Sequence, residues 1–355
     1  MSRNLPRSGA RRIFTRVGVG LAAVGLLAAC TSNTPEESEE ETDGGQQNAA
    51  SSNDEPGENV VIGFSGPQAD HGWLAAINTF AEQAAEQYSD VELRMAEGTN
   101  DPSTQISHIE TFINDGVDAI VLLPTDGAAL TQVATQAMEA GIPVVNVDRE
   151  FSDDAAARTT ILGDNYGMGV SAGEYACQLV AENNLGDDAV IAEIAGIDSL
   201  PLTQERSQGF ADALEVCGQD VDNRVAAEFT VESGEEAASN LLQAANEIDI
   251  IWNHDDDQGV GVKAAFDNAG RDEFFFIGGA GSANAMRWIQ SGEMEATVIY
   301  PATQAGDGIK LARLIAQDRG LSDLVQVEVP RRIVLDAPVV TAENVEEYLP
   351  MGFES

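Results

Sequence analysis

Short apolar runs alternate with longer segments that are apolar on one side only, starting at residue 59. The run "NVVIGFSG" precedes "WLAAINTFAEQAAEQY", in which Leu74, Ile77 and Ala84 recur at the spacing of one helix face. The runs "VELRMAEG", "VDAIVLLPTD" and "IPVVNVDRE" follow, each separated from the previous one by a helical stretch. Gly116 and Gly141 stand where two helices should end. This β-α-β-α-β-α-β order predicts a parallel sheet flanked by helices.

A second series of the same kind begins at residue 164. Its expected strands are "AVIAEIAG", "NRVAAEFT", "IDIIWNHDD", "FFFIGGAG" and "MEATVIYP", and helical stretches separate them. The pattern therefore predicts an α/β fold with two doubly wound parallel-sheet units in tandem. Ligands of such sheets bind outside the carboxyl ends of the strands. The strand ends here carry polar and aromatic residues, as in "SGPQADHGW", "DRE" and "NHDDD", so we expect two polar rims facing a cleft.

The N-terminal part of the chain has a different composition. Residues 1–29 combine five arginines with the apolar stretch "VGVGLAAVGLLAA", which is typical of an export signal. "LLAAC" resembles a bacterial lipobox and predicts lipid attachment at Cys30, the alternative being a chance buried cysteine. "ARRIF" resembles a twin-arginine signal less closely, so the export route stays open. Residues 30–58 are acidic and nearly free of apolar side chains, which predicts a disordered tether.

Composition narrows the classes of partner. The chain has 60 acidic and 18 Lys and Arg residues, a formal net charge of −42, so nucleic acid and other anionic partners are not expected. A content of 43% hydrophobic residues is enough for real cores. Two cysteines besides Cys30, Cys177 and Cys217, lie in expected helices. In an exported protein they form either a disulfide or two separately buried thiols.

Five motifs in a fixed order resemble the ribose-type periplasmic sugar-binding proteins, the receptors of bacterial ABC importers. They are "IPVVNVDRE", "LGDNYGMG", "ERSQGFADAL", "NHDDDQGVG" and "GEMEATVIYPATQAGDGI", and the likeness spans nearly all of residues 59–340. The resemblance implies a type I periplasmic binding protein fold, two lobes joined by a three-segment hinge. The crossings are expected near Gly163, near Pro301 and close to residue 325. The implied parts are a first lobe of residues 59–163 and 301–325, a second lobe of residues 164–300 and 326–346, and a tail of residues 347–355.

The first lobe has four candidate ligand-binding residues. The resemblance implies that the loop after the first strand, "DHGW", supplies Asp70 and Trp73 to the ligand. A sugar has an apolar face that stacks on an aromatic ring and hydroxyls that need polar partners. A core tryptophan beside a helix-capping aspartate is the alternative. Asp148 and Arg149 follow the fourth strand and form the expected polar grip on a sugar, rather than a surface salt bridge.

The second lobe has three candidates of its own. Arg206 matches the second sugar-binding arginine of the family, Phe229 can supply a ring or belong to the core, and Asp255 stands where the family often has asparagine. His254 and the acidic residues after it suggest a metal site. Consecutive residues at a strand end point in different directions, however, and acids are favoured at helix starts, so no metal is expected.

Two positions depart from the family pattern. Ala280 stands where the ribose-type proteins have an aspartate, and Tyr300 stands where they have a glutamine. One carboxylate acceptor is lost and one aromatic ring is gained, and Ser282 is expected to add a hydroxyl nearby. The ligand should be a small polyhydroxylated molecule that need not be ribose.

The resemblance implies an extracytoplasmic substrate-binding protein of an ABC importer. Its expected partners are a monosaccharide or polyol and the membrane-spanning permease, and it is expected to be a monomer on the outer face of the membrane, held by its lipid alone. No cofactor and no enzymatic activity are expected, because the chain lacks G-x-G-x-x-G, P-loop and G-x-S-x-G motifs. A repressor of similar fold would need a basic helix-turn-helix before residue 59. A sugar or quorum-signal receptor without a transport role stays open.

Overall fold

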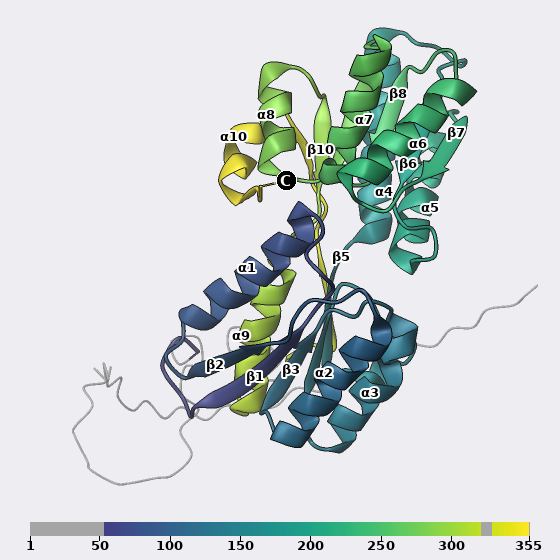
Figure 1. Cartoon of the computed structure of the whole chain (residues 1–355). Coiled ribbons are helices and arrows are strands. Elements are labelled where there is room, and N and C mark those ends of the chain that lie inside the picture. Colours follow the sequence, from purple (N-terminus) through teal and green to yellow (C-terminus); the bar gives the residue numbers. More distant parts are fainter. Residues whose placement is uncertain (1–52, 321–328, 355) are drawn as a thin grey trace, which may run out of the picture. The chain divides into compact units, whose positions relative to one another are not determined.

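The structure of the chain is a computed structural model that describes residues 53–320 and 329–354 (Figure 1). Cys30, the expected export signal and most of the expected tether lie outside the described residues. Lipid attachment and export therefore remain predictions. Within the described ranges, the structure contains no helix that is both long enough and apolar enough to span a bilayer.

The first lobe is built on a six-stranded sheet in the order β11-β5-β4-β3-β1-β2. Every neighbouring pair in it is parallel. Its strands are β1 Val60–Ser65, β2 Val91–Met95, β3 Ala119–Leu122, β4 Val144–Val147, β5 Thr159–Gly163 and β11 Arg332–Leu335. Its helices are α1 Gly72–Glu86, α2 Pro102–Asp115, α3 Gly127–Glu139 and α9 Gln304–Ala316, with the 3-10 turn η2 Asp154–Ala156.

Both faces of the first sheet are covered. Alternate residues of the strands, such as Val121 and Ile120, belong to two different hydrophobic clusters. The cluster of Val121 includes apolar residues of α1 and α9, and that of Ile120 includes residues of α2 and α3. The central strands β1, β3, β4 and β5 are therefore buried on both sides, which explains their largely apolar sequences.

The second lobe is built on a six-stranded sheet in the order β12-β10-β9-β8-β6-β7. The pairing of β12 with β10 is antiparallel and the other pairs are parallel. Its strands are β6 Ile191–Ala195, β7 Asn223–Ala226, β8 Ile250–Asn253, β9 Phe275–Ala280, β10 Ala296–Ile299 and β12 Val339–Thr341. Its helices are α4 Asn165–Asn183, α5 Pro201–Val216, α6 Val231–Ala244, α7 Asp256–Ala269, α8 Ala283–Ser291 and α10 Val345–Tyr348, with the 3-10 turn η3 Leu349–Met351.

Helices α4 and α5 pack closely against one face of this sheet. Gly169 of α4 and Gly209 of α5 make this approach possible, because a Cβ on Gly169 would lie 2.0 Å from the carbonyl oxygen of Arg206. A Cβ on Gly209 would lie 2.2 Å from the carbonyl oxygen of Tyr166. The close contact fixes the position of Arg206, one of the candidate binding residues.

The chain passes between the two sheets after β5, after β10 and after β11. Strand β5 ends at Gly163 and α4 begins at Asn165, while α9, which follows β10, packs on β3 and β4 of the first sheet. The expected third crossing near residue 325 is wrong, because β11 pairs with β5 in the first sheet. The last passage lies between β11 and β12. Residues 332–335 belong to the first lobe, where they form a short edge strand.

Part of the segment predicted to be a disordered tether is held by the first lobe. Arg313 donates from Nη1 to the carbonyl oxygen of Asn53 at 2.6 Å and from Nη2 to that of Glu55 at 2.8 Å. The amide of Gly57 donates to Asp90 Oδ2 at 2.6 Å. The tether prediction is therefore wrong for residues 53–58, whose backbone groups find fixed partners.

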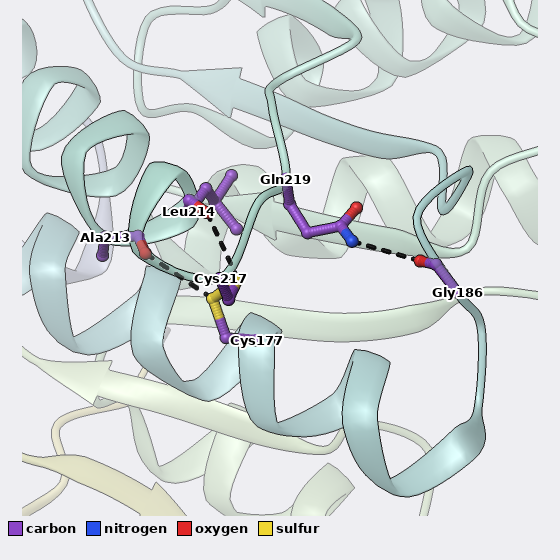
Figure 2. Close-up of a disulfide and its surroundings, with 6 residues drawn as sticks. All are labelled: Cys177, Gly186, Ala213, Leu214, Cys217 and Gln219. Atoms are coloured by element: carbon purple, nitrogen blue, oxygen red, sulfur yellow. Dashed lines mark hydrogen bonds between the residues drawn. A yellow bond between two sulfur atoms is a disulfide. The ribbon is translucent and has the colours of Figure 1, made fainter.

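Cys177 of α4 and Cys217 at the end of α5 form a disulfide (Figure 2). The Sγ–Sγ distance is 2.00 Å and the Cα–Cα distance is 6.0 Å. Of the two alternatives left open by the sequence, the structure contains the bridge. Nearby, Gln219 Nε2 donates to the carbonyl oxygen of Gly186 at 3.1 Å. Closing a loop of 40 residues is worth about 4 kcal/mol in the chain-entropy model, and the bridge ties together the two helices that carry Asn165 and Arg206.

Candidate ligand-binding site

A cavity with an empty volume of about 350 Å³ is lined by residues that follow strands of both sheets. Its walls combine three aromatic rings, two arginines and two aspartates with a histidine and two small or aliphatic residues. The lining residues are His71, Trp73, Asp148, Arg149, Leu202, Arg206, Phe229, Asp255, Ala280 and Tyr300.

Trp73 and Tyr300 form the aromatic part of the wall. Trp73 lies in the first turn of α1, and its Nε1 donates to the carbonyl oxygen of Tyr300 at 3.1 Å. The two ring centroids are 5.5 Å apart with an interplanar angle of 41°. Trp73 is only 5% exposed, so its polar edge is satisfied while its ring borders the cavity.

Three lining residues have backbone conformations that are unusual for their side chains. The φ angles of Asp148, Phe229 and Ala280 are 63°, 64° and 92°. Asp148 and Phe229 follow strands and Ala280 is the last residue of β9, whereas the other non-glycine residues with positive φ in the described part of the chain, Asn184 and Asp318, follow helices. A left-handed conformation of this kind is strained for most residues and is often found at functional sites. Here it directs three side chains toward one cavity.

Asp148 and Arg149 lie side by side without satisfying each other. Arg149 Nη1 donates to the carbonyl oxygen of Thr125 at 2.9 Å, whereas Arg149 Nε lies 3.8 Å from Asp148 Oδ2 and has no hydrogen-bond partner within residues 53–320 and 329–354. Burial lowers the pKa of the Arg149 guanidinium, and the Asp148 carboxylate opposes this shift. The pair thus offers a buried donor and a carboxylate oxygen to a ligand.

The Tyr300 hydroxyl forms a hydrogen bond with the second carboxylate oxygen of Asp148. This hydroxyl donates to Asp148 Oδ1 and accepts a hydrogen bond from Asn165 Nδ2 at 3.2 Å. Burial and the neighbouring carboxylate raise the pKa of the Tyr300 phenol well above its usual value, so it stays protonated. Gly163 leaves room for the ring, because a Cβ at this position would lie 2.1 Å from it.

Arg206 is fixed from three sides. Its Nε donates to Asn165 Oδ1 at 2.9 Å and its Nη1 donates to the carbonyl oxygen of His254 at 3.2 Å. Its guanidinium carbon lies 4.4 Å from the centroid of the Tyr300 ring and 5.9 Å from that of Phe229. Stacking on aromatic faces leaves the edge of the guanidinium for hydrogen bonds. Arg206 therefore presents a pre-positioned donor at the cavity.

The acidic residues after β8 are largely engaged with the backbone. Asp255 caps α7 by accepting from the amides of Asp257 at 2.9 Å and Gln258 at 3.3 Å. Asp256 accepts from the amides of Gly279 and Ser282. Burial raises the pKa of all three aspartates, that of Asp256 to about 7. Among the described residues no group of three His, Cys, Asp or Glu side chains is arranged to hold a metal ion.

Seven of the nine residues predicted as ligand contacts line the cavity, and two do not. Asp70 is a third exposed and accepts from His71 Nδ1, at 2.7 Å, and from Asn100. Ser282 is fully buried and its hydroxyl caps α8 by accepting from the amide of Ala285 at 3.0 Å. The side chain that reaches the cavity from "DHGW" besides Trp73 is His71, one residue after the one predicted.

Sequence reasoning also missed Leu202 and Asn165. Asn165 orients both Arg206 and Tyr300, and the only signal for it was its place in "LGDNYGMG" directly after the first crossing. Leu202 lies in the first turn of α5 and carries no chemical signal in the sequence. The complete set joins flat apolar rings to fixed donors and acceptors, which suits a small molecule with an apolar face and a ring of hydroxyls.

Comparisons with known proteins identify the family of the chain. The family model described as "Periplasmic binding protein domain" matches residues 62–320. The ribose import binding protein of Bacillus subtilis is 29% identical over 255 residues, which cover 70% of this chain and 81% of that protein. The galactofuranose-binding protein of Escherichia coli is 26% identical over 303 residues, covering 83% and 93%.

A solved structure shows the same fold. An ABC transporter solute-binding protein from Bacillus halodurans with bound myo-inositol superposes with a TM-score of 0.72 at 23% identity, covering 83% of this chain and 98% of that one. The family model spans well over half of the chain, and the two sheets have the strand order described above. The chain belongs to the periplasmic binding protein family.

Proposed function

We propose that this protein binds a monosaccharide or a related small polyol in the cavity and that the two lobes close on it without breaking any bond in the ligand. The observation that carries the proposal is the set of lining residues, which come from strand ends of both sheets and combine rings with fixed charges. A ligand that contacts both rims favours the arrangement in which the rims are close. The names of the sugar-binding relatives support the same class of ligand.

Each wall has a role in this proposal. Trp73 and Phe229 supply faces for the C–H side of the sugar. Asp148 accepts a hydroxyl through the oxygen that Tyr300 leaves open, and Arg149 Nε donates to a ligand oxygen. Arg206 and Asp255 contact the ligand from the second lobe's side of the cavity. Asp70 holds His71 through its Nδ1, so it acts on the ligand only through that imidazole.

The family places its members outside the cytoplasm, and the ABC-importer names of the relatives support a membrane permease as the partner of the loaded protein. We propose that lipid on Cys30 anchors the chain to the outer face of the membrane and that it acts as a monomer. The receptor then signals through closure alone, and a permease distinguishes the loaded from the empty form.

A thermal-shift screen of the purified protein against pentoses, hexoses and polyols tests the proposal. Calorimetry then gives the Kd of each hit, with micromolar or tighter binding expected. Binding of the hit should be abolished or strongly weakened in the Asp148→Ala variant. A protein that is stabilised by no sugar or polyol, but by an amino acid or a peptide, would refute the assignment.

A further inference from the structure

Helix α1 begins without a cap from its own lobe. Its first residue is Gly72, and His71 stands at the N-cap position without any side-chain hydrogen bond to the helix. The neighbouring helix α2 is capped locally, by Asp101, which accepts from the amide of Ser103 at 2.9 Å. The first amides of a helix need an acceptor, so the missing partner of α1 has to come from elsewhere.

The acceptor comes from the second lobe. Asp257 Oδ2 accepts from the amide of Gly72 at 3.0 Å, and the same carboxylate interacts with the amide of Trp73. Asp257 lies in the first turn of α7, after strand β8 of the second sheet, and is only 5% exposed. One buried side chain of the second lobe therefore caps a helix of the first.

The electrostatics favour this contact. The start of each α-helix carries a partial positive charge, and the starts of α1 and α7 both lie against the Asp257 carboxylate. Burial raises the pKa of Asp257, and His71 and the two amides of α1 oppose that rise. Asp255 caps α7 itself, so the acceptor that Asp257 supplies serves the start of α1.

The contact lies beside the cavity without being part of its wall. His71 and Trp73, on either side of Gly72, line the cavity, and so does Asp255, two residues before Asp257. Gly72 follows the first sheet and Asp257 follows the second, so any separation of the two rims lengthens this hydrogen bond.

We propose that Asp257 is a positioning residue for ligand binding, a helix cap supplied across the two lobes that stabilises the ligand-holding arrangement without touching the ligand. The inference rests on the proposed function. Loss of the cap should leave every ligand contact in place and shift the balance toward separated rims. The ligand then escapes faster, because fewer contacts hold the rims together.

The test uses the purified protein with the sugar that binds best in the screen. Asp257→Ala is expected to raise Kd by about 3- to 30-fold, mainly through a faster dissociation rate followed by stopped-flow fluorescence. Asp257→Asn keeps an acceptor oxygen and should bind within about threefold of wild type, because asparagine caps helices nearly as well as aspartate. Equal Kd values for wild type and Asp257→Ala, or an asparagine variant as weak as the alanine variant, would overturn the proposal.

Asp101→Ala is the matched control, since it removes a cap that lies within one lobe. It should lower the melting temperature and leave Kd unchanged, whereas Asp257→Ala should raise Kd. Hydrogen exchange without sugar gives a ligand-independent readout, in which the Gly72 and Trp73 amides exchange faster in Asp257→Ala. Equal exchange in the two proteins refutes the cap itself, while a wild type that binds no sugar refutes the proposed function.

Discussion

Two buried Asp–Arg pairs in the first lobe have the same chemistry and very different hydrogen bonding. Asp90 and Arg313 join through Nε at 2.9 Å and Nη2 at 2.7 Å, and their side chains are 2% and 1% exposed. Asp148 is also buried, with its side chain 3% exposed, and that of Arg149 is 13% exposed, but the nearest atoms of this pair, Nε and Oδ2, are 3.8 Å apart. The first pair forms a bidentate bridge and the second does not.

The difference separates a pair that stabilises the fold from the pair that we propose binds the ligand. Around Arg313, the remaining donors reach backbone carbonyls of the N-terminal segment, and Asp90 also accepts from Gly57 and Gln317. Around Arg149, Nε has no hydrogen-bond partner in the part of the chain that the structure describes. A buried donor without a partner costs roughly 1–3 kcal/mol of folding free energy, more when it is charged. A ligand oxygen in the cavity would satisfy this donor.

Removing one partner of the first pair should have the largest effect on stability. Arg313→Ala leaves the Asp90 carboxylate buried and uncompensated, and we expect a loss of about 3–5 kcal/mol in the free energy of unfolding. Urea unfolding followed by circular dichroism measures it. The exposed pair of Arg332 and Glu150 is the control, because Arg332→Ala should cost about 0.5 kcal/mol or less. Sugar affinity should be unchanged in both variants, and a lower affinity in Arg313→Ala would erase the distinction between the pairs.

In the Asp148–Arg149 pair, removing one partner should mainly weaken ligand binding rather than lower stability. Asp148→Ala removes the acceptor of a ligand hydroxyl and leaves the Arg149 guanidinium without its neighbouring charge, so binding should weaken by about 2–4 kcal/mol, roughly 30- to 1000-fold. The free energy of unfolding should fall by less than in Arg313→Ala, by about 1–3 kcal/mol, because the buried Tyr300 hydroxyl loses its acceptor. Asp148→Asn is the companion variant, because asparagine tolerates the φ of 63° at this position. A wild-type Kd in both variants, measured by calorimetry, would show that the cavity is not the binding site.

Lowering the pH should weaken the Asp90–Arg313 pair by protonating the Asp90 carboxylate. Burial alone would raise the pKa of Asp90, but the hydrogen bonds from Arg313, Gly57 and Gln317 hold it well below its usual value. A depressed pKa in the folded state stabilises the fold at pH values above the ordinary pKa near 4, and this stabilisation is lost as the pH falls below it. The stability gap between wild type and Arg313→Ala should therefore narrow from pH 6 to pH 3. A gap that is constant over this range would contradict the assignment.

The sequence predicted most of the fold because the strands are buried on both faces. Strand β3 is a continuous apolar run, and β4 is one apart from Asn146, as expected of central strands covered on both faces. Strands β11 and β12 lie at sheet edges, and in β11 the exposed Arg332 and Val334 alternate with half-buried residues. Nothing in "RRIVLDAPVV" marks which sheet each half joins, so the third crossing was misplaced.

The candidate site was predictable at the level of strand ends but not of side-chain direction. Strand ends pointed to Asp148, Arg149 and Phe229, which do line the cavity. The side chains of neighbouring residues point in different directions at a strand end, which is why His71 rather than Asp70 borders the cavity. Ser282 failed for another reason, since its hydroxyl is used to cap α8. The direction of a side chain depends on tertiary hydrogen bonds that a single sequence does not reveal.

The smallest effect that we predict concerns the second carboxylate oxygen of Asp148 and the group that donates a hydrogen bond to it. This group is the hydroxyl of Tyr300, which stands where a second ligand hydroxyl would otherwise donate. Tyr300→Phe keeps the ring over Gly163 and beneath Arg206 but frees Asp148 Oδ1. In this variant, the binding free energy of a sugar should improve by about 1 kcal/mol relative to that of the deoxy analogue, which lacks the hydroxyl facing Asp148. This corresponds to a roughly three- to tenfold change in the ratio of the two Kd values.

The measurement is the ratio of the two Kd values, obtained by calorimetry for each sugar and its deoxy analogues in both proteins. Using a ratio removes any general loss of affinity that the variant causes through packing. Tyr166→Phe serves as the control, because the Tyr166 hydroxyl binds Asp212 on the surface, away from the lining residues of the cavity. If no sugar and deoxy pair changes its ratio in Tyr300→Phe, then the ligand places no hydroxyl on the Oδ1 atom that the variant frees. The Tyr300 hydroxyl would in that case be a structural partner of Asp148 and would not limit which hydroxyls the cavity accepts.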